Sequence, residues 1–213
     1  MSVWLPQGYR EVSELEVKRS RFLTTVARVE DEAGAREVVA EVRRTWPDAR
    51  HHCTAFIVEM PGAQPVERSS DDGEPSGTAG RPMLDVLRGA GLAQVVAVVT
   101  RYFGGVKLGT GGLVRAYSDA VSLAIDGAPR VRPVVSSVSE VTFSYADAAR
   151  AQDAFAAHGL RVLDSEYGEA VTLRVAGDGE LLRGLAAEIV REDVAIEPRG
   201  EHLVEEPEPP ASA

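Results

Sequence analysis

A glycine-rich segment, residues 101–112, combines the groups best suited to chemistry in this sequence. Five of the nine residues at 104–112 are glycine. The segment follows an apolar run at 95–99, which is typical of a buried strand. It precedes residues 113–125, where apolar side chains recur at helical spacing. The pattern predicts a loop that joins a core strand to the start of a helix.

Such a loop directs free backbone N–H groups and the positive end of the helix dipole to one place, which attracts anions. Arg101 and Lys107 add positive charge. Tyr102 or Phe103, if exposed, could stack on a base, although the favoured interpretation is that both belong to the core. The ligand-binding residues predicted in this segment are Arg101, Tyr102, Phe103, Gly104, Gly105, Lys107, Gly109, Thr110, Gly111 and Gly112.

Two known phosphate-binding motifs do not fit the segment. Gly104 and Gly109 have P-loop spacing, but Thr110 occupies the position that requires lysine. A dinucleotide fingerprint that starts at Gly109 would need a glycine at Val114. The sequence therefore indicates an anion or phosphate site without naming the ligand. The alternative is that the glycines only allow a tight turn and close helix–strand packing.

A second glycine-containing segment, residues 69–82, leads into another predicted helix, with Pro82 in its first turn. Its predicted ligand-binding residues are Ser76, Gly77, Thr78, Gly80 and Arg81. Three acidic residues in the same segment could hold Mg²⁺ through oxygen ligands, although a solvated acidic turn is the favoured interpretation; they are Asp71, Asp72 and Glu74. We expect no resident metal or cofactor.

His51, His52 and Cys53 are adjacent at the start of a predicted strand, so His51 and Cys53 should share one face. Zinc would need further ligands that this region does not offer. Cys53 is expected to be a buried structural residue rather than a nucleophile. His51 or His52 could make a polar contact in the ligand cleft, and His51 is the one predicted as a ligand-binding residue.

Four stretches together resemble the YigZ/Impact family: residues 18–22, 47–53, 70–80 and 101–112. Their order and spacing match, and the similarity extends to about residue 200. The resemblance implies an α+β protein with two domains. The first would be ribosomal protein S5 domain 2-like, and the second would have a ferredoxin-like βαββαβ fold, similar to a terminal domain of the translocating elongation factor.

The resemblance also implies a role in the regulation of translation. Eukaryotic relatives regulate initiation in the amino-acid stress response by competing for an activator of a general-control kinase, and they carry an additional RWD domain. The similarity extends over nearly the whole sequence, so we expect no RWD domain and do not transfer that partner. The resemblance implies no catalytic residue.

Composition and charge narrow the possible partners. Of 213 residues, 44% are hydrophobic, one is cysteine, and the net charge is −10. Residues 1–130 carry 16 Lys/Arg and 17 Asp/Glu, whereas residues 131–213 carry 7 and 16. An anion-binding face therefore belongs to the first part. A single cysteine, the lack of a signal peptide and the lack of a membrane-length apolar run indicate a cytoplasmic protein without a membrane partner.

Periodicity places an Impact-type α/β domain at residues 1–128, with a long polar loop at 60–77. A proline-containing linker is expected at 129–136 and the ferredoxin-like domain at 137–199. The acidic, proline-rich residues 200–213 are expected to be a disordered tail.

These observations favour a cytoplasmic, translation-associated regulatory protein that binds nucleic acid, either RNA or the ribosome, through the glycine-rich loop. Its second domain could dock on a protein partner. The alternative is a Mg²⁺-dependent enzyme acting on a small phosphorylated metabolite or a nucleotide. The sequence favours the non-enzymatic function without excluding catalysis.

Overall fold

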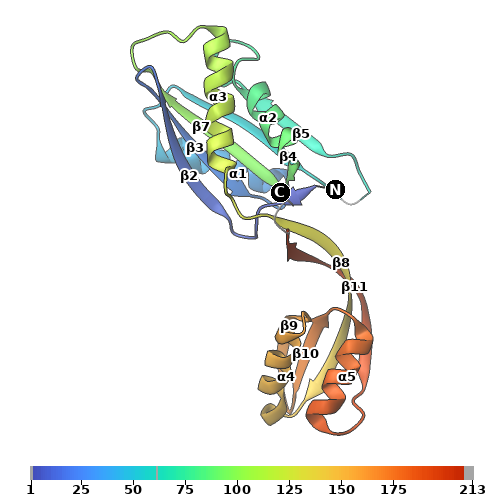
Figure 1. Ribbon diagram of the computed structural model, residues 1–213. Coiled ribbons are helices and arrows are strands. Elements are labelled where there is room, and N and C mark those ends of the chain that lie inside the picture. Colours follow the sequence, from blue (N-terminus) through green and yellow to red (C-terminus); the bar gives the residue numbers. More distant parts are fainter. Residues whose placement is uncertain (1, 61, 209–213) are drawn as a thin grey trace. The chain divides into compact units, whose positions relative to one another are not determined.

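The computed structural model describes residues 2–60 and 62–208, which form two compact units (Figure 1). The first unit holds the described residues up to Arg132 together with residues 207 and 208, and the second spans Pro133–Glu206. In the described residues no helix has the length and apolar character needed to cross a membrane.

The first unit is built on a five-stranded antiparallel sheet with the order β2-β3-β7-β4-β5. Two short strands, β1 and β6, pair with each other beside it, and three helices pack on the sheet (Figure 1). The elements are β1 (Val3–Trp4), β2 (Arg10–Val17), β3 (Ser20–Arg28), α1 (Glu32–Thr45), β4 (His51–Val58), β5 (Val66–Ser70), α2 (Gly80–Gly89), β6 (Leu92–Ala93), β7 (Val95–Tyr102) and α3 (Thr110–Ile125).

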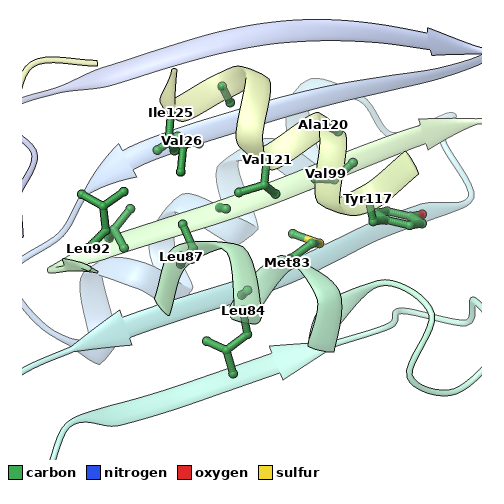
Figure 2. Close-up of a cluster of buried hydrophobic side chains, with 14 of the residues drawn as sticks. Val26, Met83, Leu84, Leu87, Leu92, Val99, Tyr117, Ala120, Val121 and Ile125 are labelled. Carbon is green, nitrogen blue, oxygen red and sulfur yellow. The ribbon is translucent and has the colours of Figure 1, made fainter. Parts of the chain in front are cut away.

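Alternation along β7 divides the apolar core into two layers, because successive side chains of a strand point to opposite faces. Val95, Ala97 and Val99 pack with α2 and α3, whereas Val96 and Val98 pack with α1. Figure 2 shows the first layer, where α2 and α3 lie over the central strands. The central strand β7 is therefore covered on both faces. This packing fixes the position of its carboxyl end, from which the glycine-rich segment continues.

Local sequence explains how the helices begin and end. Asp31 caps α1 by accepting a hydrogen bond from the amide of Gly34 at 2.8 Å, and Pro47 follows soon after the helix ends. By contrast, α3 begins after Gly109, whose φ is 74°, and no side chain caps it. A left-handed φ of this kind favours glycine.

The second unit has the element order βαββαβ, and its strands are arranged in the order β11-β8-β10-β9. This is the ferredoxin-like arrangement, and the predicted α+β fold class is confirmed. The elements are β8 (Val131–Phe143), α4 (Tyr145–Ala157), β9 (Arg161–Tyr167), β10 (Val171–Ala176), α5 (Gly179–Val190) and β11 (Ile196–Pro207).

Three local expectations differ from the structure. Most of the expected linker, residues 129–136, belongs to β8, and the expected disordered tail at 200–213 is strand β11 as far as Pro207. Pairing with β8 satisfies the backbone of this acidic segment, which composition alone did not indicate. Residues 209–213 lie outside the described residues. The loop expected at 60–77 contains strand β5, an exposed edge strand whose polar residues hide its periodicity.

Candidate anion-binding site

The two glycine-containing segments of the first unit meet at one pocket of about 340 Å³. Glu74 and Pro75 come from the loop between β5 and α2, and the stretch from Lys107 to Thr110 comes from the glycine-rich segment. The full lining consists of Arg50, His51, Glu74, Pro75, Arg101, Phe103, Lys107, Leu108, Gly109, Thr110 and Leu113. The volume is at the lower end of the range for small-ligand sites, so the pocket fits a ligand the size of one nucleotide.

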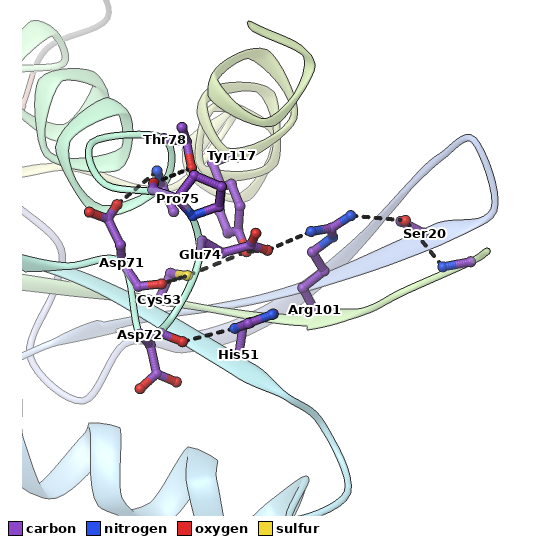
Figure 3. A network of polar contacts seen from close by, with 12 residues as sticks. Ser20, His51, Cys53, Asp71, Asp72, Glu74, Pro75, Thr78, Arg101 and Tyr117 are labelled. Carbon is purple, nitrogen blue, oxygen red and sulfur yellow. Dashed lines mark hydrogen bonds and ion pairs between the residues drawn. The ribbon is translucent and has the colours of Figure 1, made fainter. Parts of the chain in front are cut away.

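The inner wall of the pocket is a buried polar network, shown in Figure 3. Arg101 donates to Glu74 at 2.6 Å, and their side chains are only 7% and 4% exposed. Tyr117 of α3 donates to the same Glu74 oxygen at 2.8 Å. A second guanidinium nitrogen of Arg101 lies 3.4 Å from the Ser20 hydroxyl, which also accepts from the amide of Gly104 at 3.2 Å. The network therefore ties β3, β7, α3 and the 71–80 loop together.

Burial keeps the Tyr117 hydroxyl of this network and the neighbouring Cys53 thiol in their neutral forms. Desolvation raises the pKa of the Cys53 thiol to about 12, and it also raises the pKa of Tyr117 far above its ordinary value. The Cys53 sulfur lies 3.0 Å from the Asp71 carbonyl oxygen and 3.3 Å from the Tyr117 hydroxyl. A neutral, enclosed thiol is a poor nucleophile, which agrees with the structural role expected for Cys53.

The outer wall of the pocket contains the first turn of α3. Its first amides have no partner within the helix, and no described side chain caps them. Gly109, Thr110 and Gly111 are exposed. An added Cβ at Gly111 would meet no atom within 4 Å, so the space in front of this turn is open. The start of α3 thus offers donors and a positive dipole end to an incoming anion.

Two positively charged side chains at the pocket are available to a ligand. Two others that the sequence predicted as ligand-binding residues are not. Lys107 and Arg50 line the pocket, are exposed and form no ion pair within residues 2–60 and 62–208. Arg101 is neutralised by Glu74, and Arg81 lies outside the lining and pairs with Asp85 at 3.0 Å. Arg101 therefore shapes the wall, while Lys107 and Arg50 supply the charge.

The two predicted aromatic residues have different environments. Phe103 lines the pocket with 54% of its surface exposed, and the Arg101 guanidinium lies 5.7 Å from its ring centroid. Tyr102 is half-buried and donates to Asp48 at 2.8 Å. Phe103 is therefore the ring with a free face for stacking.

The start of α2 already has an internal anion. The Asp71 carboxylate accepts hydrogen bonds from the amides of Gly77, Ala79 and Gly80 at 2.8–2.9 Å. Burial alone would raise the pKa of Asp71, but these amides hold it below its usual value. The Thr78 hydroxyl donates to the Pro75 carbonyl. The predicted ligand residues Ser76, Gly77, Thr78, Gly80 and Arg81 do not line the pocket.

The three acidic residues considered for Mg²⁺ do not converge. Asp71 binds the backbone amides, Asp72 pairs with Arg43 at 2.6 Å, and Glu74 pairs with Arg101. Across the described part of the chain no group of three metal-ligating side chains comes together. Each carboxylate has a structural partner, so the residues present do not fit a magnesium site.

His51 lines the pocket, as the sequence suggested. Its Nδ1 lies 2.8 Å from the Asp72 carbonyl oxygen. A carbonyl can only accept, so Nδ1 of His51 is the donor in this contact. His52 points to the opposite face and contacts Thr100; burial is the main reason that its pKa is lowered. Sequence inspection missed Arg50 as a binding residue, although it lies beside His51 within the family-like stretch 47–53.

An α/β unit with this pocket, followed by a ferredoxin-like unit, defines the class of protein. The Impact N-terminal domain matches residues 18–125, and a domain of unknown function, DUF1949, matches residues 141–182. The crystal structure of a hypothetical protein aligns with a TM-score of 0.59 and 34% identity, covering 92% of this chain and 97% of that one.

Sequence similarity to individual proteins leads to the same class. The IMPACT family member YigZ of Escherichia coli is 38% identical over 176 residues, which is 83% of this chain and 86% of that protein. An IMPACT family member of Haemophilus influenzae is 46% identical over 125 residues, or 59% of this chain and 61% of that protein. The chain belongs to the IMPACT family.

Proposed function

We propose that this protein is a cytoplasmic, translation-associated regulator that binds a phosphate-bearing partner, RNA alone or in the ribosome. Binding uses the pocket at the start of α3. The observation that carries the proposal is the combination, in one pocket, of an uncapped helix start, the exposed ring of Phe103, and the cations Lys107 and Arg50, which form no ion pair with any described residue. Membership of the IMPACT family supports the connection with translation.

The proposed contacts follow from the chemistry of each group. The free amides at the start of α3, where Thr110 lines the pocket, bind a phosphate oxygen, and Lys107 and Arg50 neutralise its charge. Phe103 stacks on an unpaired base, an interaction that tolerates any sequence. The second unit carries the excess negative charge of the chain, which fits docking on a protein better than contact with RNA.

An enzymatic function receives less support. His51 lines the pocket together with the hydroxyl-bearing Thr110, but within the described residues no hydrogen bond joins the two side chains, so they do not form a base-activated nucleophile. The carboxylates that a Mg²⁺-dependent reaction would need are engaged elsewhere. A binding function therefore explains more of the pocket's features than the alternative function, phosphoryl transfer on a small metabolite, does.

Filter binding of the full chain to total RNA across a salt series tests the proposal. We expect measurable binding at low salt, a linear fall of log K with log salt, and clear weakening by Lys107→Glu. Arg44→Glu is the matched control, because Arg44 is an exposed arginine on α1, which packs on the opposite face of the sheet. Absence of binding at low salt, or equal effects of the two charge reversals, would contradict the proposal.

A further inference from the structure

The tight turn between β2 and β3 has an unusual composition for its geometry. Val17 pairs with Ser20, so only Lys18 and Arg19 connect the strands. Their φ angles are 48° and 65°. Two-residue turns with two positive φ angles favour Asn-Gly, because larger L side chains are strained in this region. This turn therefore carries two basic side chains in place of the residues that would relieve its strain.

The same turn touches the glycine-rich segment. A Cβ added at Gly104 would lie 2.0 Å from both the carbonyl carbon and the oxygen of Arg19, so only glycine permits this approach. The Ser20 hydroxyl accepts from the Gly104 amide and so fixes the turn to the segment. Gly104 directly follows Phe103, which lines the pocket. The turn and the pocket wall are thus held together by backbone contacts.

The side chains of the turn are free to bind. Lys18 and Arg19 are exposed, and neither forms an ion pair with any residue that the structure describes. Arg21, two residues further along, is instead held by Glu14 at 2.6 Å. Strained backbone that is retained at a surface indicates a role beyond folding. Two cations without an ion pair among the described residues, beside the pocket proposed to bind phosphate, indicate that this role is phosphate binding.

We propose that the Lys18-Arg19 turn is a second phosphate-binding element, and that the ligand is single-stranded RNA that extends from the pocket to this turn. One nucleotide occupies the pocket, because about 340 Å³ admits a single unpaired base with its phosphate. Neighbouring phosphates of the strand contact Lys18 and Arg19. This inference rests on the proposed function, and it distinguishes an RNA strand from a small phosphorylated metabolite.

The variant Lys18→Asn/Arg19→Gly separates a binding role from a structural one. Asn-Gly suits the turn, so we expect the melting temperature of the full chain to rise by about 3 °C. The affinity for a 5′-phosphorylated hexauridylate should fall about tenfold, and the slope of log K against log salt should decrease by about 1.4 in magnitude. A turn with only a structural role would gain stability without losing affinity.

Ligand length supplies the second measurement. For the unmodified chain, we expect affinity to increase from uridine monophosphate through the trinucleotide to the hexanucleotide, and the turn variant should lose most of this increase. The mononucleotide should bind both proteins equally, since the pocket is unchanged. Lys107→Glu, by contrast, should weaken binding at every length.

Each contrary result has a defined meaning. If the turn variant binds hexauridylate with unchanged affinity and salt slope, the inference is overturned while the proposed function stands. If the unmodified chain binds the mononucleotide as tightly as the hexanucleotide, or prefers duplex RNA, the extended single strand is overturned. If the unmodified chain binds no RNA at low salt, the proposed function and the inference both fail.

Discussion

Arg101 and Glu74 form an ion pair of 2.6 Å within the wall of the pocket, and both side chains are more than nine-tenths buried. The pair joins the end of β7 to the loop before α2, so it connects the two segments from which the pocket is made. Removing one partner would leave an uncompensated buried charge, which costs far more than the pair itself contributes.

Glu74→Gln should therefore destabilise the first unit by about 3–5 kcal/mol, since the Arg101 guanidinium loses its counter-charge. Urea denaturation measures the change in the free energy of unfolding. Glu32→Gln breaks the exposed pair with Arg36 on α1 and is the control, with an expected cost of about 0.5 kcal/mol or less. Equal losses in the free energy of unfolding would show that the buried Arg101–Glu74 pair stabilises the fold no more than an exposed pair does.

Asp71→Asn should destabilise the protein by about 1–2 kcal/mol, because the amides of Ala79 and Gly80 lose a charged acceptor. The pKa of Asp71 in the folded protein lies below the ordinary 3.8. Its ionised form therefore stabilises the fold at neutral pH, and this contribution disappears as the pH falls from about 4 through the lower folded-state pKa.

Thermal melts of both proteins between pH 7 and pH 2.5 test this pH dependence. The difference in melting temperature between the native protein and Asp71→Asn should shrink at the acid end. A difference in melting temperature that stays constant over the whole pH range would argue against stabilisation by the ionised Asp71 carboxylate. Asp119→Asn, at an exposed position on α3, is the control and should follow the native protein.

Gly104→Ala should cost about 2–4 kcal/mol, because a methyl group there would overlap the Arg19 backbone. Chemical denaturation provides the measurement. Gly111→Ala, in the first turn of α3 with open space around its Cβ, should be neutral or slightly stabilising. If both substitutions proved equally mild, the contact between the turn and the glycine-rich segment would not be as close as described.

The Cys53 thiol should not react with a disulfide reagent at pH 8 while the protein is folded, since burial raises its pKa to about 12. Reaction should begin only when denaturant unfolds the first unit. Following absorbance of the released thiolate against urea concentration then reports unfolding of that unit. Rapid reaction without denaturant would show that the thiol is accessible and ionised.

Phe103→Ala should reduce affinity for single-stranded RNA about tenfold, because the exposed ring supplies the stacking surface. Phe103→Tyr should retain most of the affinity. Val106→Ala removes a neighbouring exposed apolar side chain and should leave binding unchanged. Fluorescence anisotropy with labelled hexauridylate distinguishes the three variants, and unaltered binding by Phe103→Ala would exclude stacking.

The sequence by itself predicted the helices that follow the two glycine-containing segments, the βαββαβ order of the second domain and the family. The apolar run at 95–99, the Asp31 cap and the βαββαβ order are local signals, which depend on neighbours within a few residues. Strand β5 and residues 200–207 of β11 escaped detection, because their order comes from pairing with strands that are distant in the chain. Composition alone made both segments resemble loops.

The site required the tertiary structure. The sequence selected Lys107, His51 and Phe103 as candidate binding residues from locally visible types and spacing, and the structure places all three in the pocket lining. The sequence could not determine that Glu74 neutralises Arg101, that Asp71 occupies the amides of Gly77 and Gly80, or that Gly104 contacts Arg19. Whether a charge or an amide is free depends on which distant residue folding brings beside it, and chain order does not encode that proximity directly.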